Sequence, residues 1–259
     1  MPYQTLTLDH DGPLALITLN RPEKRNAISP QMIDDLLAAL EAVEASAARV
    51  AILTGAGKAF CAGMDLEVLR TISSQTPEQN LQDSRRMAQL FRRLWSFPKP
   101  LIAAVNGPAL AGGCAVATLA DFTLAAPEAT FGYTEVRIGF VPAIVSVFLR
   151  RRVGEAIARD LMLTARIFPA AEAHELGLVN EVVAADSLMP RARELAATLV
   201  AHSPSGLLAT KKLIVECQEQ AIDRELSLAV HANAAVRSTP DFREGVASFL
   251  EKRPPKWSS

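Results

Sequence analysis

The stretch KPLIAAVNGPALAGGCAVATLAD, residues 99–121, decides the fold class. Its apolar run 101–105 predicts a short buried strand, and the segment behind Gly112 and Gly113 predicts a helix. A glycine turn between a strand and a helix leaves backbone N–H groups free at the helix N-terminus, where they can bind partial negative charge. The residues after the turn, such as Ala115, supply no acid, base or phosphate ligand, so the backbone itself is the candidate functional group.

The same alternation of strand and helix continues on both sides of this stretch. Short apolar runs predict strands at 14–19, 50–53 and 122–125. Helices are predicted from the N-cap and proline pair at 29–30, over 65–71 and over 82–97, whereas the polar segment 72–80 is expected to be mobile. From about residue 143 the pattern is mainly helical, and from 187 onward it is only helical. The alternation predicts an α/β core followed by an all-helical C-terminal part.

Composition excludes several classes of protein. The chain has 259 residues, is 49% hydrophobic and has a net charge of −1, which gives no sign of a nucleic-acid partner. Its three cysteines are too few for a disulfide framework, and neither a signal peptide nor a membrane span is recognisable, so we expect a cytoplasmic protein away from membranes. The four histidines are isolated and the HExxH and CxxC motifs are absent, so no metal site is expected.

The sequence does not contain two common nucleotide-binding motifs or the nucleophile motif of esterases. The segment TGAGKAF, residues 54–60, lacks the first glycine and the Ser or Thr of a phosphate loop, and it lacks the third glycine of a dinucleotide fingerprint. The G-x-S-x-G elbow of esterases does not occur in the sequence. We interpret Cys61 and Cys114 as small buried residues rather than nucleophiles, because no basic partner is adjacent in sequence.

A second glycine turn, FCAGMDL at 60–66, suggests a specific chemistry. Two backbone N–H donors aimed at one oxygen form an oxyanion hole, which needs no polar side chain. Its acid–base partner would be Glu135, in the apolar and aromatic segment FGYTEVRIGFVPA (131–143), where desolvation would raise the pKa of the carboxyl. The alternative for Glu135 is a surface ion pair with Arg137.

Six segments together resemble the crotonase superfamily, also called the enoyl-CoA hydratase/isomerase family. They are LNRPEKRNAIS (19–29), LTGAGKAFCAGMDL (53–66), the opening stretch 99–121, ATFGYTEVRIGFVPA (129–143), AAEAHELGLVNEVV (170–183) and EGVASFLEKRPP (244–255). The resemblance implies a crotonase-like spiral of ββα turns in an α/β core. It further implies a catalytic, acyl-CoA-binding core over 1–195 and a C-terminal helical oligomerisation region over 196–259, giving a homotrimer or a hexamer built as a dimer of trimers.

The resemblance also assigns roles to individual residues. The substrate would be an acyl-CoA thioester, with its carbonyl oxygen held by the backbone N–H groups of Met64 and Gly112 and with Glu135 as the general acid/base. No cofactor beyond the CoA moiety of the substrate is implied. The positions that match the family's CoA- and substrate-binding residues are Lys24, Arg25, Ala27, Ala62, Asp65, Phe249 and Lys252, the last two in a segment that can reach a neighbouring subunit's CoA.

One departure leaves the reaction open. The two-glutamate hydratases of the family carry their first glutamate where this chain has Ala115, and only the second is kept, as Glu135. The leading interpretation is an enoyl-CoA hydratase of fatty acid metabolism, in which Glu135 or another group such as Tyr133 orients the water. The alternative is an enoyl-CoA isomerase that shuttles a proton on Glu135 alone. Ala143 disfavours a dienoyl-CoA isomerase, and a non-catalytic CoA- or RNA-binding member of the family is the alternative from another class.

Overall fold

Two sheets organise the fold in the computed structural model, which describes residues 3–72 and 74–258. The larger sheet has the order β1-β2-β3-β4-β6-β9, and all its neighbours are parallel except the antiparallel pair β1 and β2. The smaller sheet has the order β5-β7-β8. The strands are β1 (Leu6–Asp11), β2 (Leu14–Leu19), β3 (Val50–Gly55), β4 (Leu101–Val105), β5 (Ala109–Leu110), β6 (Phe122–Ala125), β7 (Thr130–Gly132), β8 (Phe168–Pro169) and β9 (Glu181–Val182).

Successive turns of the chain place one strand in each sheet before a helix. Strand β4 lies in the larger sheet, β5 in the smaller one, and α4 (Gly112–Thr118) follows; β6, β7 and α5 (Ala143–Thr164) repeat the pattern. Strands β3 and β4 are buried along their whole length, as parallel strands covered on both faces must be. This repetition is the predicted spiral of ββα turns, and the mixed α/β class is confirmed.

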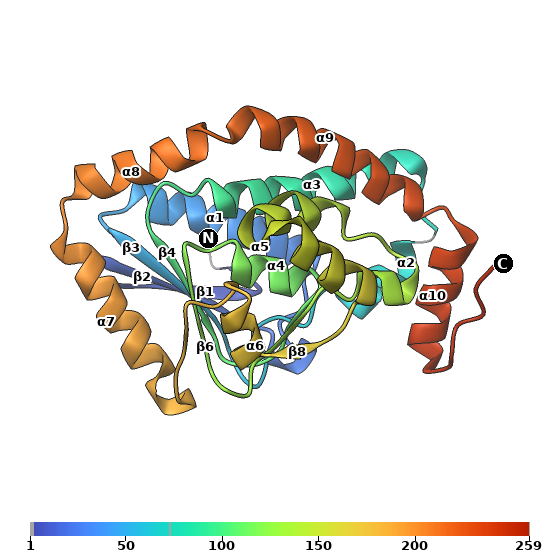
Figure 1. Ribbon diagram of the computed structural model, residues 1–259, viewed down its shortest axis with the longest axis horizontal. Helices are drawn as coiled ribbons and strands as arrows, with labels where there is room; N and C mark the ends of the chain where they lie inside the picture. The colour runs from blue at the N-terminus through green and yellow to red at the C-terminus, as the bar shows by residue number, and fades with distance from the viewer. Residues whose placement is uncertain (1–2, 73, 259) are drawn as a thin grey trace.

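Helices cover both sheets. The remaining helices are α1 (Pro30–Ala45), α2 (Leu66–Ile72), α3 (Pro77–Trp95), α6 (Ala170–Glu175), α7 (Leu188–Ala201), α8 (Pro204–Glu216), α9 (Glu219–Val236) and α10 (Pro240–Glu251), with single 3₁₀ turns at Pro22–Lys24, Glu135–Ile138 and Ala185–Ser187. Figure 1 shows α9 running along α3, and α10 beside the C-terminus, where it packs on α2 and on the Glu135–Ile138 turn. Helix α7 packs on β3, β4 and β6, with Ala192 and Ala196 buried against the sheet. The predicted division after residue 195 therefore falls within a helix that covers the core, and it stays a prediction.

Two local expectations need correction, one strand was not predicted, and one helix cap is confirmed. The polar segment 72–80 is not simply a mobile loop: Thr76 and Gln79 form a reciprocal capping box, so α3 starts at Pro77 rather than near residue 82. Ser73 lies outside the described residues. Strand β1 was not predicted, although a two-residue turn with Gly12 at φ +56° joins it to β2 as a hairpin. The predicted N-cap Ser29 is confirmed, because its side chain accepts a hydrogen bond from Met32 N.

Candidate active site

The two glycine turns lie against each other. Leu110 N donates to Cys61 O over 3.0 Å, which ties the second turn to the first. A Cβ on Gly113 would lie 2.2 Å from Cys61 O, and one on Gly63 would lie 3.1 Å from Leu110 O. Gly63 also adopts φ +92°, a conformation that side chains disfavour. Glycine is therefore required at both positions for the turns to approach this closely.

The close packing of the two glycine turns leaves two backbone N–H donors available beside one cavity. Neither Met64 N nor Gly112 N donates a hydrogen bond within residues 3–72 and 74–258. Gly112 is the first residue of α4, so no intrahelical acceptor exists for its N–H. The residue before it, Ala111, adopts φ 48° and ψ −126°, an uncommon conformation for a residue with a side chain.

A cavity of about 790 Å³ brings the predicted site residues together. Its lining includes Glu135, Met64, Gly112, Lys24, Arg25, Ala27, Ala62, Asp65, Phe249 and Lys252. These residues come from the loop after β2, the turn before α2, the start of α4, the turn after β7, and α10 with its C-cap. Residues that are far apart in sequence thus face one space, and α10 of the same chain forms part of its wall.

Glu135 presents a sequestered carboxylate to this cavity. It opens the 3₁₀ turn Glu135–Ile138, and its Oε2 atom is buried without a hydrogen-bond partner among the described residues. Burial raises the pKa of this carboxyl to about 7, partly opposed by a hydrogen bond from its own backbone N–H. Arg137 is exposed, and it forms no ion pair with Glu135 in the part of the chain that the structure describes. A carboxyl with this pKa can both accept and return a proton near neutral pH.

The loop after β2 is held rigidly at the cavity entrance. The buried side chain of Asn26 accepts from Arg21 N and donates to Ala56 O and Ala59 O over 2.8–2.9 Å. Arg21 donates to Asp65 Oδ2 and to Ala27 O. Burial would raise the pKa of the Asp65 carboxyl, but Glu67 N and the Arg21 guanidinium outweigh it and hold the pKa below its ordinary value. No sequence pattern marks Asn26, and its role in holding the loop is visible only from its burial and its three hydrogen bonds.

Basic side chains surround the entrance. Lys24 Nζ lies 2.8 Å from Glu67 Oε1, and this hydrogen bond raises the pKa of the ammonium group. Lys252 caps the C-terminus of α10, and the ring of Phe249 one turn earlier is about half exposed. These groups can meet an anionic, partly aromatic ligand that extends from the cavity to solvent.

Three residues near the site do not contribute a side chain to the cavity. Ala115 is fully buried in α4 and is not part of the lining. Tyr133, which the sequence analysis considered for orienting water, is also fully buried, and its hydroxyl is engaged with Thr118 Oγ1 at 3.1 Å. That expectation was wrong, because the ring points into the core. Burial raises the pKa of Cys61 and of Cys114 to about 12, which removes both thiols as nucleophiles.

Two kinds of feature are absent from the described residues. They contain no cluster of three or more His, Cys, Asp or Glu side chains arranged to hold a metal ion. Within the same residues, no helix is both long enough and apolar enough to cross a bilayer.

The chain is similar to a known family over almost its whole length. The family model described as enoyl-CoA hydratase/isomerase matches residues 9–259. A Thermus thermophilus protein named "Putative enoyl-CoA hydratase" is 44% identical over 247 residues, covering 95% of this chain and 98% of that protein. The crotonyl-CoA hydratase of Syntrophomonas wolfei is 34% identical, covering 98% and 97%. The crystal structure of an enoyl-CoA hydratase/isomerase from Xanthobacter autotrophicus Py2 superimposes with a TM-score of 0.89 at 32% identity, covering 99% and 100% of the two chains.

Proposed function

Because the chain belongs to the enoyl-CoA hydratase/isomerase family, we propose that it adds water to a 2-enoyl-CoA with Glu135 as its general acid/base. The observation that carries the proposal is the buried Glu135 carboxyl, whose Oε2 atom has no hydrogen-bond partner among the described residues. It lies in the same cavity as Met64 and Gly112, whose backbone N–H groups donate no hydrogen bond within those residues. The hydratase names of the similar proteins support hydration over other reactions of the family.

In the proposed mechanism the thioester oxygen accepts hydrogen bonds from Met64 N and Gly112 N. Ionised Glu135 takes a proton from water as the oxygen of that water bonds to Cβ, and the electron pair of the C=C bond moves to the thioester as an enolate. The two N–H donors stabilise the charge that develops on its oxygen, and one such donor is worth about 3–4 kcal/mol in the transition state. Protonated Glu135 then returns the proton to Cα, which restores the carboxylate and balances the reaction.

The CoA moiety explains the basic entrance. We expect Lys24, Arg25 and Lys252 to contact its phosphates, with Lys24 leaving Glu67 to do so, because an exposed ion pair is worth little and exchanges readily. Ala27, Ala62, Asp65 and Phe249 would shape the path of the adenosine and pantetheine portions. We further expect a cytoplasmic homotrimer or hexamer that needs no cofactor beyond the CoA of its substrate.

Ala115 favours one second candidate, an enoyl-CoA isomerase. Its methyl group replaces the carboxylate that would hold water in a two-glutamate hydratase, and Ala115 is itself fully buried outside the cavity lining. In an isomerase, Glu135 would remove a proton from C2 of a 3-enoyl-CoA and return it to C4, and no water would be needed.

One experiment separates the two reactions. The protein is incubated in heavy-oxygen water with crotonyl-CoA and, separately, with 3-hexenoyl-CoA, and the products are analysed by mass spectrometry. Hydration predicts a 3-hydroxyacyl-CoA carrying the heavy isotope. Isomerisation predicts migration of the double bond without incorporation of oxygen.

Glu135→Gln tests the assignment of the carboxylate, with Glu128→Gln as the matched control because Glu128 is exposed seven residues earlier. Loss of a general acid/base lowers kcat by about 10²–10⁴-fold, so Glu135→Gln is expected to lose that factor while the control keeps full activity. Full turnover by Glu135→Gln would overturn the assignment, and no turnover by the unaltered protein would favour a non-catalytic CoA-binding role.

A further inference from the structure

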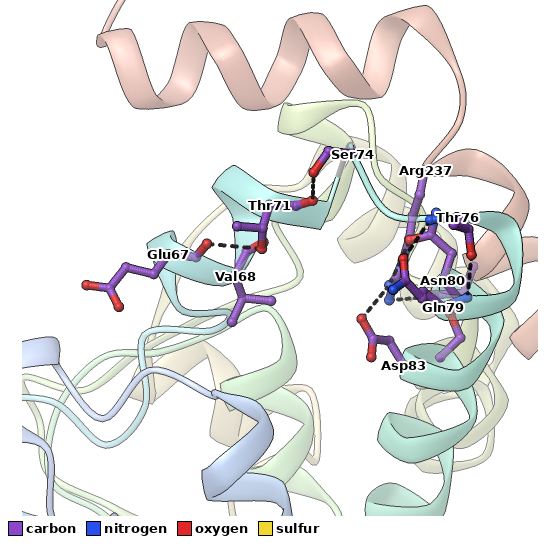
Figure 2. Close-up of polar contacts among 11 residues, drawn as sticks. Glu67, Val68, Thr71, Ser74, Thr76, Gln79, Asn80, Asp83 and Arg237 are labelled. Carbon is purple, nitrogen blue, oxygen red and sulfur yellow. Dashed lines mark hydrogen bonds and ion pairs between the residues drawn. The ribbon is translucent and has the colours of Figure 1, made fainter.

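The cavity has a buried positive charge, which the proposed mechanism does not use. Arg237 caps the C-terminus of α9, its side chain is only 3% exposed, and it lines the same cavity as Glu135. Figure 2 shows it reaching from the end of α9 toward Asn80 and Asp83 on α3. A buried guanidinium needs close, well-aligned acceptors to offset the hydration that it has lost.

The acceptors around Arg237 are incomplete. Its Nη1 atom lies 3.6 Å from Asp83 Oδ2 and 3.4 Å from Asn80 Oδ1, and its Nη2 atom lies 3.2 Å from Asn233 Oδ1. Its Nε atom is buried and has no hydrogen-bond partner within the described residues. By contrast, Arg21 reaches Asp65 Oδ2 at 2.8 Å, the distance expected of a charge-assisted hydrogen bond.

The group nevertheless stays charged. Loss of hydration lowers the pKa of Arg237 to about 10, partly opposed by Asp83, so the guanidinium is protonated at neutral pH. The guanidinium also packs over the ring of Phe140, 5.6 Å from its centroid. Asp83 is about one-third exposed, and its Oδ2 atom forms only a long ion pair of 3.6 Å with Arg237. The cavity therefore holds a cation with an unused donor that an incoming anion can satisfy.

Arg237 lies away from the entrance that would take CoA. In Figure 2, Glu67, which pairs with Lys24, and Arg237 lie on opposite sides of the view, with Val68 and Thr71 of α2 between them. The wall near Arg237 also includes the apolar side chains of Met87, Phe140 and Ile72. An acyl chain that begins beside Glu135 would therefore share one cavity with these apolar side chains and with the guanidinium of Arg237.

We propose that the acyl group of the substrate carries a carboxylate at the end remote from the thioester, and that Arg237 binds it. The inference rests on the proposed acyl-CoA function and names its substrate class, the CoA monothioesters of unsaturated dicarboxylic acids. The planar guanidinium matches a carboxylate, and Nε together with an Nη atom forms the fork that binds its two oxygens. Asp83 is the competing anion, at a distance that leaves it without a hydrogen bond to Arg237.

Binding of saturated thioesters tests the proposal independently of catalysis. Dissociation constants are measured by calorimetry for hexanoyl-CoA and adipyl-CoA, which have the same chain length, and for the glutaryl and pimelyl homologues. The unaltered protein is expected to bind the best dicarboxylic thioester about tenfold more tightly than its monocarboxylic counterpart. Equal or weaker binding of every dicarboxylic thioester would overturn the proposal.

Three variants test whether Arg237 causes the preference for dicarboxylic thioesters. Arg237→Met keeps much of the volume and removes the charge, so it is expected to abolish the preference while binding hexanoyl-CoA within about threefold of the unaltered protein. Arg237→Lys keeps the charge without the fork and should retain part of the preference. Asp83→Asn removes the competing anion and should enlarge the preference, which keeps the test valid even where an Arg237 variant fails to fold. An unchanged preference in Arg237→Met or a reduced one in Asp83→Asn would contradict the assignment.

Kinetics separate this proposal from the proposed function. Hydration of hex-2-enoyl-CoA and of the monothioester of hex-2-enedioic acid is compared in the unaltered protein and in Arg237→Met. The expected effect is on KM for the dicarboxylic substrate, with kcat little changed. Absence of turnover with both substrates, alongside tighter binding of adipyl-CoA, would refute the hydratase and leave the carboxylate site standing. Turnover without any preference for dicarboxylic thioesters would support the hydratase and refute the carboxylate site.

Discussion

At the scale of single residues, the ionisation of Glu135 links stability to pH. Burial raises the pKa of its carboxyl from 4.5 to about 7. A carboxyl whose pKa rises on folding stabilises the folded state below its unfolded pKa, and this contribution disappears as the pH rises through the folded pKa. Relative to Glu135→Gln, the free energy of unfolding of the unaltered protein should therefore fall by about 2–3 kcal/mol between about pH 4.5 and pH 8. Urea denaturation of both proteins across this range measures it, and parallel curves would contradict it.

The same carboxyl should control activity in the opposite direction. The single-carboxylate mechanism begins with ionised Glu135, both for hydration and for isomerisation. We therefore expect kcat/KM to fall about tenfold for each pH unit below about 7. A pH profile with crotonyl-CoA in matched buffers checks this, and a profile that is flat between about pH 5 and pH 8 would exclude Glu135 as the ionising group.

Ala111 combines a strained backbone with a position beside the site. Its φ of 48° and ψ of −126° suit glycine better than alanine, and such strain costs about 1–3 kcal/mol. Ala111→Gly is therefore expected to raise the free energy of unfolding by about 1 kcal/mol. Ala42→Gly, in the exposed face of α1, is the control and should lower it by about 1 kcal/mol. Chemical denaturation measures the free energy of unfolding of both variants. A lower free energy of unfolding in Ala111→Gly would contradict the inference that Ala111 is strained.

At the scale of elements, variants of the first residue of α4 test whether the backbone N–H of Gly112 is a hydrogen-bond donor in the reaction. Gly112→Pro removes the N–H at the first helical position, where proline fits the helix, whereas Gly112→Ala keeps the N–H. In either variant the new Cβ would meet the end of the Ile28 side chain at 3.2 Å. We expect Gly112→Pro to lower kcat by about 10²–10³-fold relative to Gly112→Ala. Steady-state kinetics of folded variants measures the ratio, and equal activities would argue against Gly112 N as a donor.

The helices and strands also show where sequence patterns are sufficient to predict the bounds of an element. The strands at 14–19, 101–105 and 122–125 were predicted at their observed bounds, because each is a short run of mostly apolar residues. The start of α3 was misplaced because its first turn is polar, and the signal there is the capping pair Thr76 and Gln79 rather than hydrophobic spacing. Strand β1 was missed because four of its last five residues are exposed, at one edge of the sheet.

At the scale of the whole molecule, the sequence predicted the groups at the site better than their surroundings. The two glycine turns and Glu135 stand beside recognisable strands and helices, so local patterns and the family resemblance located them. Arg237 and Asn26 carry no such signal. Their importance comes from burial and from partners distant in the chain, as when Asp83 meets Arg237 across two helices. The orientation of Tyr133 was unpredictable for the same reason, since the packing of the core decides it.

The position of α10 is the feature of the whole molecule that most directly affects the cavity. Gly245 of α10 lies so close to the 3₁₀ turn after Glu135 that a Cβ on it would be 2.3 Å from the carbonyl oxygen of Ile138. Gly139, at φ +66°, meets the first turn of α10 equally closely, with its own Cβ position 2.5 Å from Asp241 O. Because both obstacles are backbone atoms, an added methyl group can be accommodated only by moving the helix.

Gly245→Ala is therefore expected to loosen α10 and withdraw Phe249 and Lys252 from the cavity. KM for an enoyl-CoA should rise about tenfold, equivalent to about 1.4 kcal/mol of lost binding, while kcat changes less because Glu135 and the glycine turns stay in place. Hydrogen exchange over 240–251 should accelerate in the same variant. Gly206→Ala in α8 is the matched control, since its Cβ would meet only ordinary contacts at 3.5 Å with Ser203. Unchanged exchange and KM in Gly245→Ala would mean that the position of α10 does not control access to the site.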